Sequence, residues 1–404
     1  MLDGGDRMQS HVYVSKFTTV NAAGTGTLQF QQALEQGRSG LHPNQFDGTN
    51  LEVYVGEVGG IDSVDISVEL AHYNCRNNRL AQLCLQQDGF ADYVWQLKQR
   101  YSDQRIGVIM GTSTSGIHKL EQDYRNINPV SAALPDDGNA RFTHNLYSVA
   151  SFVKAYFQLR GPAHVISTAC SSSAKVFASA ARMLTLGIVD AVIVGGVDSL
   201  CLNTLYGFDS LQLLSKQACQ PLDVNRSGIS IGEGAGFAVL ENTAAYADFP
   251  IRLLGFGESS DSYHMSSPSP NGEGAVLSMQ KALRMARLTP WDIAYINMHG
   301  TGTAINDKAE SAAIGSLFDT DVPCSSSKGW FGHTLGAAGV IEAIVCFLAL
   351  KNQYLPGTLN CRQLDPELGI NALMQNQAYN VDVVLSNSFG FGGSNCSLIF
   401  GAVT

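Results

Sequence analysis

Two segments of this chain follow the same order of apolar strand, small-residue corner, helix and second apolar strand. The first comprises 164–173, an Ala-rich helix to about residue 186, and a strand at 191–196. The second comprises 321–328, a Gly-rich loop, a helix over about 335–350, and a strand at 383–387. Strands that are apolar throughout and alternate with helices indicate parallel or mixed sheets covered by helices on both faces. The weak repeat predicts an α/β fold of two similar halves, stacked so that corresponding corners meet in one site.

The division between the halves falls near residues 242–250. We expect an N-terminal half over 11–246, a C-terminal half over 247–404, and a disordered lead-in over 1–10. No low-complexity linker marks the division, so the halves should pack as one unit. A chain of 404 residues is long enough to bury a large core.

Charge and composition exclude several classes of protein. The formal net charge of −10 argues against a nucleic-acid partner. No apolar run reaches the roughly 18 residues that a membrane span needs, and the N-terminus has no apolar signal-peptide core. The nine cysteines are scattered singly without a CxxC pair, which indicates free thiols in a reducing cytoplasm.

Cys170 occupies the corner of the first repeat copy, between a β-prone run and a helix. At a helix N-terminus, unpaired backbone N–H groups and the helix dipole favour negative charge. We therefore expect the thiol pKa to fall below its usual value of about 8.5, which would make Cys170 a nucleophile at neutral pH. The alternative is a core cysteine, because free cysteines usually pack as small hydrophobic side chains.

Two histidines lie in corners of similar character. His299 ends a short apolar run and His333 precedes a helix, and both are flanked by glycine and hydroxyl residues. Together with Cys170 they form a Cys–His–His nucleophilic set. A zinc site is the competing interpretation, although its ligands would be single and widely spaced. The Gly-rich segment 387–395 would let a backbone N–H point into the site as an oxyanion donor.

These segments together resemble the β-ketoacyl-acyl-carrier-protein synthases of the thiolase superfamily, in particular the elongating, decarboxylating type. The match covers about residues 105–401 in the family's order, and the preceding residues match more loosely. The residues that carry it are Thr168-Ala169-Cys170-Ser171-Ser172, Arg226-Ser227-Gly228, Gly232-Glu233-Gly234-Ala235-Gly236, Ser259-Ser260-Asp261, His299-Gly300-Thr301-Gly302-Thr303, Asp307 with Glu310, Lys328, Gly332-His333, Gly336 and Gly339 with Glu342, and Asn387 to Gly393.

The resemblance implies a thiolase fold with α/β/α/β/α layers and an acyltransferase that performs a decarboxylative Claisen condensation. Cys170 would hold the acyl group as a thioester, and malonyl-acyl carrier protein would supply the enolate after loss of CO2. The substrates would arrive on the phosphopantetheine arm of the carrier protein, without a metal or a resident cofactor. The family also implies a dimer, either with itself or with a ketosynthase-like subunit.

The resemblance also assigns roles to individual residues. His299 and His333 would stabilise the negative charge that decarboxylation builds on a thioester oxygen, and Lys328 would orient the site. The backbone N–H groups of Cys170 and Phe391 would form the oxyanion hole. Three acidic residues would be structural supports rather than catalysts; they are Asp307, Glu310 and Glu342.

The acyl pocket and its gate would be lined by Thr114, Phe208, Ile229, Phe389 and Phe391. Two of these depart from the family's pattern, because Ile229 replaces a usual phenylalanine and Thr114 replaces a bulky aliphatic residue. Thr114 suggests a pocket for a longer, stiffer or more polar chain than a saturated fatty acid, such as a polyene or aryl-polyene chain. Such a chain would place the protein in a specialised fatty-acid or polyketide pathway.

Several alternatives remain open from the sequence. A chain-length-factor-like partner subunit usually lacks the nucleophile, whereas this chain has Cys170, His299 and His333. A degradative thiolase uses a second cysteine, and the condensing enzymes that start from acyl-CoA have His and Asn. From a different class, a non-catalytic scaffold or zinc-binding module is possible. Arg125 and Arg141 are candidates for a basic patch that would bind the acidic carrier protein.

Overall fold

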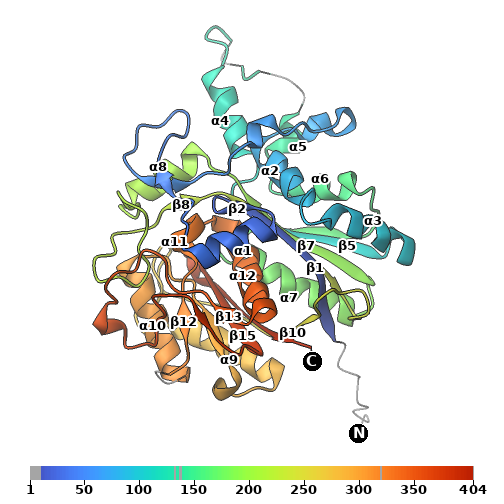
Figure 1. The fold of residues 1–404 in the computed structure, drawn as a ribbon. Helices are drawn as coiled ribbons and strands as arrows, with labels where there is room; N and C mark the ends of the chain where they lie inside the picture. The colour runs from blue at the N-terminus through green and yellow to red at the C-terminus, as the bar shows by residue number, and fades with distance from the viewer. Residues whose placement is uncertain (1–10, 132, 136–138, 319–320, 404) are drawn as a thin grey trace.

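The computed structural model of this chain describes residues 11–131, 133–135, 139–318 and 321–403. The lead-in predicted over 1–10 lies outside the described residues. Figure 1 shows the chain gathered around a long twisted sheet, with helices on both of its faces and between its two parts.

Ten strands follow one another across this sheet, and a short strand, β2 (Gly24–Thr25), pairs with β1 at one side. Five come from the N-terminal half, in the spatial order β6 (Ala163–Ile166), β5 (Ile106–Gly111), β7 (Ala191–Asp198), β9 (Gly234–Glu241) and β1 (Val12–Asn21). Five come from the C-terminal half, in the order β12 (Cys324–Ser325), β11 (Tyr295–Asn297), β15 (Val383–Gly390), β16 (Ser394–Ala402) and β10 (Ile251–Ser260).

The two groups of strands have the same topology. In each group the third strand along the chain lies at the outer edge, followed by the second, fourth, fifth and first. The directions also agree, because β5 is parallel to β6 and β7 as β11 is to β12 and β15, while the remaining pairs are antiparallel. Strands β1 and β10 pair over three residues and join the groups. The predicted pair of repeated halves is thus present, and residues 242–250 connect them.

Helices form three layers around these strands. The five N-terminal strands are called the N-terminal sheet below, and the five C-terminal strands the C-terminal sheet. The N-terminal sheet is covered on its outer face by α2 (Arg76–Leu85), α3 (Phe90–Arg100) and α6 (Ser148–Tyr156). The C-terminal sheet is covered by α9 (Glu273–Ala286) and α10 (Ala304–Phe318). Between the sheets, α7 (Ser172–Thr185) packs against α12 (Ala338–Asn352) in the largest apolar core. This is the α/β/α/β/α arrangement that the family resemblance implies.

The sequence pattern explains the central layer. Strands β7 and β9 are buried along their whole length, which accounts for their continuous apolar sequence. Helix α12 is buried from Ala338 to Leu350, because it faces α7 and both sheets. A helix that is apolar all round is typical of such a central position.

The segment Leu335–Asn352 is long and apolar enough to cross a membrane, by length and composition alone. Glu342 and Lys351 interrupt this segment, so its uninterrupted apolar runs stay shorter than 18 residues, as the sequence indicates, while its average hydropathy remains high. In this fold 89% of the segment is buried inside the protein, where it forms the central core helix.

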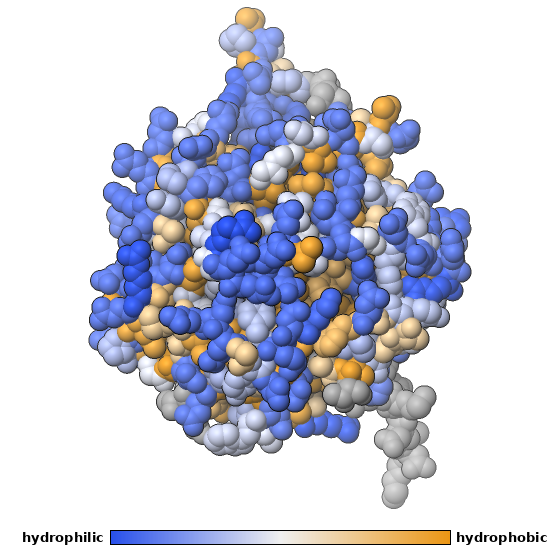
Figure 2. Space-filling view, in the orientation of Figure 1, coloured by the Kyte–Doolittle hydropathy of each residue, from blue (hydrophilic) through white to orange (hydrophobic). Residues whose placement is uncertain are grey.

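The remaining elements are short helices and strands. Helices α4 (Ile117–Arg125) and α5 (Ala140–Thr143) stand away from the sheet at the top of the molecule (Figure 1). The other short elements are α1 (Thr27–Gln36), α8 (Leu202–Ser210), α11 (Lys328–Phe331), β3 (His42–Pro43), β4 (Tyr54–Gly56), β8 (Ile231–Gly232), β13 (Tyr354–Leu355) and β14 (Gln377–Ala378). Figure 2 shows that the face in this view is mainly hydrophilic, with small scattered apolar patches.

Candidate active site

Cys170 lies in the corner between β6, which ends at Ile166, and α7, which begins at Ser172, as the sequence predicts. The preceding residue, Ala169, has a φ of 50°, a left-handed conformation that turns the chain sharply at this corner. The cysteine is only 4% exposed, because the loop after β15 covers it. At Gly390, the last residue of β15, an added Cβ would lie 2.7 Å from the backbone oxygen of Thr168, so only glycine fits.

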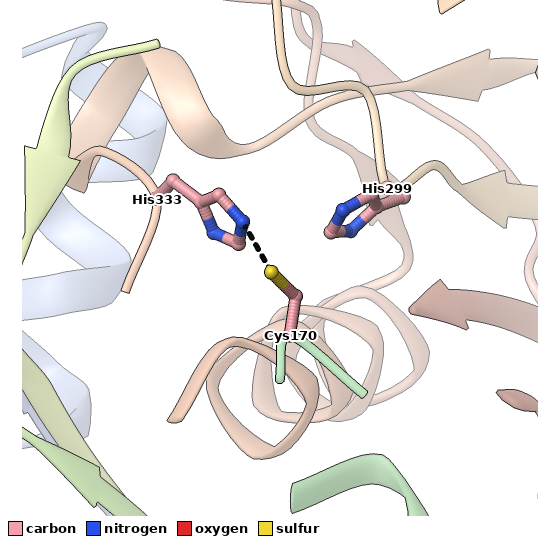
Figure 3. Close-up of side chains that lie close together, drawn as sticks. All are labelled: Cys170, His299 and His333. Atoms are coloured by element: carbon pink, nitrogen blue, oxygen red, sulfur yellow. Dashed lines mark hydrogen bonds between the residues drawn. The ribbon is translucent and has the colours of Figure 1, made fainter. Parts of the chain in front are cut away.

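His333 and His299 converge on the same sulfur from the C-terminal half. Figure 3 shows both imidazole rings directed toward the Cys170 thiol, with His333 nearer. Nε2 of His333 lies 3.0 Å from Sγ of Cys170, and the two ring centroids are 5.2 Å apart in an edge-to-face arrangement. The corners of the two repeated halves thus meet in one site, as the stacking of the halves predicts.

The electrostatic state of the thiol differs from the expectation. Burial raises the pKa of Cys170 to about 12, and Glu342 and Asp198 add to the rise. The charge of Lys328 and the backbone N–H of Phe391, which donates toward the sulfur, oppose it. The prediction of a lowered pKa is therefore wrong, because loss of hydration outweighs the helix N-terminus. The resting cysteine is a neutral thiol that needs a base.

Burial also lowers the pKa of both histidines well below the usual 6.5, and the charge of Lys328 lowers it further. Each ring is therefore neutral at physiological pH. Nζ of Lys328 donates to the backbone oxygen of His299 and to Oε1 of Glu342, and lies 3.4 Å from Nδ1 of His299. An ammonium group only donates, so Nδ1 accepts and the proton of the His299 ring stands on Nε2.

Three buried carboxylates hold this part of the site. Glu342 pairs with Lys328, and its own pKa is raised to about 7 by burial. Glu310 accepts from the backbone N–H groups of His299 and Gly300, both at 2.8 Å. Asp307 accepts from the backbone N–H groups of Leu222 and Gly302, and it lies 3.5 Å from Nε of Arg226. All three contact the loops or the lysine, and none lines the main cavity with the thiol.

A cavity of about 420 Å³ leads to the three reactive groups. The lining side chains include Cys170, His299, His333, Ile229, Phe389 and Phe391. The ring of Phe391 lies 5.5 Å from that of Phe208, centroid to centroid, and both are partly exposed. Phe208, Ile229, Phe389 and Phe391 therefore line the same cavity as the thiol.

Two family models match consecutive segments of this chain, which together contain Cys170, His299 and His333. The model described as "Beta-ketoacyl synthase, N-terminal domain" covers residues 75–245, and "Beta-ketoacyl synthase, C-terminal domain" covers residues 251–362. The 3-oxoacyl-acyl-carrier-protein synthase 2 of Rhizobium meliloti is 37% identical over 331 residues, which are 76% of this chain and 77% of the relative. The chain belongs to the β-ketoacyl synthase family. The predicted family is thus confirmed.

Other comparisons agree over nearly the full length. The 3-oxoacyl-acyl-carrier-protein synthase 2 of Vibrio harveyi is 32% identical over 421 residues, 96% of this chain and 98% of the relative. A chain in the structure of the ketosynthase ApeO in complex with its chain length factor ApeC, from Xenorhabdus doucetiae, has a TM-score of 0.87 and 37% identity, with 97% and 98% of the two chains covered. This β-ketoacyl synthase therefore has the thiolase fold and is an acyltransferase of the condensing type.

Thr114 does not occupy the position that the sequence analysis gives it. It is buried outside the cavity, and both its backbone N–H and its hydroxyl donate to Asp198 at 2.9 Å. A hydroxyl with a strong buried acceptor turns toward that acceptor rather than toward an apolar chain. Asp198 was missed from the sequence, although a carboxylate at the end of a buried strand is a signal for it.

The surroundings of Cys170, His299 and His333 disfavour the alternative of a zinc site. Ligand atoms of Cys170, His299 and His333 all lie within 4.8 Å of one another. However, the Lys328 ammonium stands beside them, and its charge lowers the pKa of both imidazoles. A divalent cation is disfavoured where the potential is already positive. Structural zinc sites also use four protein ligands, and this group of described residues offers three.

Proposed function

We propose that this synthase elongates an acyl chain by decarboxylative condensation, with Cys170 as the acyl-carrying nucleophile. The observation that supports this most is the convergence of one thiol and two neutral imidazoles in one cavity. The relatives are named for substrates bound to acyl carrier protein. The same carrier would bring both substrates here on its flexible arm, so the enzyme would need no resident cofactor or metal.

In the first half-reaction, His333 accepts the Cys170 proton at Nε2 while the sulfur attacks the acyl thioester. A new carbon–sulfur bond forms, and the oxyanion is held by the backbone N–H groups of Cys170 and Phe391. The bond to the carrier's thiol then breaks, and the proton on His333 passes to that leaving sulfur. The support for this sequence is the 3.0 Å contact between Nε2 and Sγ.

In the second half-reaction, the malonyl group loses CO2, and the electrons of the broken carbon–carbon bond move onto the thioester oxygen. Nε2–H of His299 would donate to that oxygen. For His333 to donate as well, its ring would first take a proton from solvent on Nε2 and release the one on Nδ1, after the first carrier thiol has left. Each such donor contributes about 2.7–4 kcal/mol by analogy with oxyanion holes. The enolate carbon then attacks the acyl-Cys170 carbonyl, and the bond from that carbon to the cysteine sulfur breaks as the 3-oxoacyl product forms. The departing thiolate takes up one proton from solvent and becomes the neutral resting thiol again.

Lys328, Glu342, Glu310 and Asp307 would act through position rather than on the substrate. Lys328 keeps Nδ1 of His299 an acceptor, and Glu342 holds the lysine. Glu310 holds the two peptide groups at His299 and Gly300. We place these four residues in a supporting role for that reason.

The acyl chain, assembly and compartment are the finer parts of the proposal. A polyene or aryl-polyene chain stays a prediction, and Thr114 no longer supports it. Assembly with a ketosynthase-like subunit is supported by likeness to structures of ketosynthases with chain length factors, and assembly as a homodimer stays a prediction. A chain-length factor role for this chain itself is disfavoured by the intact Cys–His–His set. Nine free, buried cysteines support a cytoplasmic location.

Mass spectrometry of the purified protein tests this proposal. The protein is incubated with a panel of saturated, unsaturated and aryl acyl-carrier proteins, and the peptide that contains Cys170 is examined. We expect an acyl adduct on Cys170 whose yield ranks the chains. If saturated medium chains react as fast as all others, the polyene prediction fails; if no chain acylates Cys170, the condensing mechanism fails.

A further inference from the structure

Asp198 is a buried carboxylate that the proposed mechanism does not use. It is the last residue of β7 and is fully buried. Its two oxygens accept from six donor groups at 2.5–3.0 Å, which are Thr112 Oγ1, the backbone N–H and hydroxyl of Ser113, the backbone N–H and hydroxyl of Thr114, and the backbone N–H of Gly336. Among the described residues no Lys or Arg pairs with it. A buried charge held by neutral donors alone needs all of them.

The six donors belong to two separate loops. One is the loop after β5, which contains Ser113, and the other is the corner between His333 and Gly336. Gly336 is the second residue of the helical stretch Leu335–Asn352, and its N–H lies 2.6 Å from Asp198. The positive end of that helix dipole favours a carboxylate at this place. Asp198 therefore joins the start of the central helix to the β5 loop.

Both loops hold unusual backbone conformations next to this carboxylate. Leu335 has a φ of 51° and Ser115 a φ of 47°, and both are buried non-glycine residues. Left-handed conformations of this kind cost about 1–3 kcal/mol and persist only where the surroundings hold them. Asp198 supplies that restraint through Gly336, the neighbour of Leu335 in the chain.

The same loops reach both members of the reactive pair. His333 lies three residues before Gly336, and on its other side its backbone pairs with Ser230 and Gly232. The β5 loop begins at Gly111, where an added Cβ would lie 2.5 Å from the backbone nitrogen of Ser173 in α7. That residue is three positions after Cys170. Asp198 thus connects the corner that carries His333 to the packing beneath the nucleophile.

We infer that Asp198 is a positioning residue that fixes His333 against Cys170 by holding these two loops together. The inference rests on the proposed function of the Cys170–His333 pair. Asp198 does not line the cavity, so it does not touch the substrate. Its loss should therefore lower the rate of the bound complex rather than the affinity for either carrier-bound substrate.

Steady-state kinetics of Asp198→Asn test this first. The amide keeps the size of the side chain, but its NH2 group would face a donor where a carboxylate oxygen now accepts. We expect kcat to fall about 10- to 100-fold, as for a small misplacement of reacting groups, with KM for both substrates unchanged within about twofold. Glu241→Gln is the matched control, because Glu241 is an equally buried carboxylate at the end of β9, bound to Tyr93. Its kcat should equal that of the wild type.

Two further variants test whether kcat falls because the two loops move, rather than because Asp198 loses its charge or the protein does not fold. In Gly336→Ala, the new Cβ would lie 2.7 Å from Oδ2 of Asp198 and 2.8 Å from the backbone nitrogen of Ser113, so the two loops must separate although the carboxyl group is still present. Its kcat should fall like that of Asp198→Asn. Ser113→Ala removes one of the six donors on a partly exposed residue, and a fall of about two- to fivefold is expected. If the other two variants do not fold, the kcat of Ser113→Ala tests the role of Asp198 in their place.

Alkylation of Cys170 by iodoacetamide, followed by mass spectrometry across a pH series, gives a readout that needs no condensation. In Gly336→Ala the rise of the rate with pH should shift to higher pH, because His333 no longer accepts the thiol proton. A wild-type protein that fails to condense would overturn the proposed function, while the alkylation profiles would still test Asp198. Folded variants with wild-type kcat and an unshifted alkylation profile would overturn the role of Asp198.

Discussion

Nζ of Lys328 lies 3.4 Å from Nδ1 of His299, and the same group donates to the backbone oxygen of His299 and to Glu342. Three acceptors use the three protons of the ammonium, so a buried charge is fully bonded. Because Nδ1 of His299 accepts, the proton of the ring must stand on Nε2, at the opposite side of the imidazole. A residue that does not line the cavity thereby sets which histidine atom donates to the substrate.

Replacing this lysine tests the relationship. In Lys328→Met, Nδ1 of His299 loses its donor and the ring is free to adopt either tautomer. We expect malonyl decarboxylation, measured as CO2 release, to fall about 10²- to 10³-fold, as when an oxyanion donor is removed. Lys308→Met is the control, because Lys308 forms an exposed pair with Glu367. Its rate should stay within twofold of the wild type, and an equal loss in both variants would contradict the assignment.

The raised pKa of Cys170 predicts a slow resting thiol. A pKa of about 12 means that the thiolate fraction of the free enzyme rises about tenfold per pH unit through neutral pH. The rate of iodoacetamide alkylation at Cys170 should therefore increase steadily from pH 6 to pH 9. A rate that is already constant near pH 6 would show a stable thiolate instead.

The lowered pKa values of His299 and His333 predict a wide acid range of activity. A histidine of ordinary pKa is largely protonated at about pH 5.5, whereas these two rings stay neutral. Protonation of these two rings should thus not limit malonyl decarboxylation between about pH 7.5 and 6, and a change of rate in this range would report Glu342, whose pKa is raised to about 7. The two rings lower the stability of the fold as the pH falls below about 6.5, because the unfolded chain then binds protons that the folded rings do not. Glu310 and Glu342 oppose this loss, because burial raises their pKa values to about 7 and the folded state therefore binds protons there first. Initial rates and thermal melting across this range check both effects.

Substitutions at Gly390 and at Phe391 test separately what the backbone and the side chain contribute at this wall of the cavity. Gly390→Ala would bring a Cβ within 2.7 Å of the backbone oxygen of Thr168 and displace the N–H of Phe391. We expect acyl transfer to Cys170 to fall about 10²- to 10³-fold, because that N–H is half of the oxyanion hole. Phe391→Ala keeps the N–H and removes the contact with Phe208, so acyl transfer should persist with weaker discrimination among chains.

Gly315→Ala in α10 is the matched glycine control for this pair. Nothing lies within 4 Å of its added Cβ, so the activity should be unchanged and the helix more stable by about 0.5–1 kcal/mol. Single-turnover acylation followed by mass spectrometry measures all three variants. Equal acylation in Gly390→Ala and the wild type would remove Phe391 from the oxyanion hole.

The sequence predicts those parts of this site that lie in short, repeated patterns. The corners at Cys170, His299 and His333 were recognisable because each joins an apolar run to small residues, and the repeat implied that the corners would meet. The order of strand, corner and helix in each half was predictable for the same reason, since strand β6 with helix α7 and strand β12 with helix α12 hold equivalent places in the two halves.

The features that the sequence did not predict depend on groups far apart in the chain. The thiol pKa is set by how completely the Gly390 loop buries Cys170, which local helix geometry does not reveal. The orientation of Thr114 depends on Asp198, 84 residues away. Burial and long-range hydrogen bonds of this kind appear only once the two halves are packed.

The most direct test of the whole account follows the mass of the intact enzyme through one turnover. The enzyme is first mixed with acyl-carrier protein and then with malonyl-carrier protein, and both the enzyme and the products are measured. We predict an acyl adduct on Cys170 that disappears as CO2 and the 3-oxoacyl product form in equal amounts, and no product from Cys170→Ala. Formation of the product without the adduct, or by Cys170→Ala, would contradict the account.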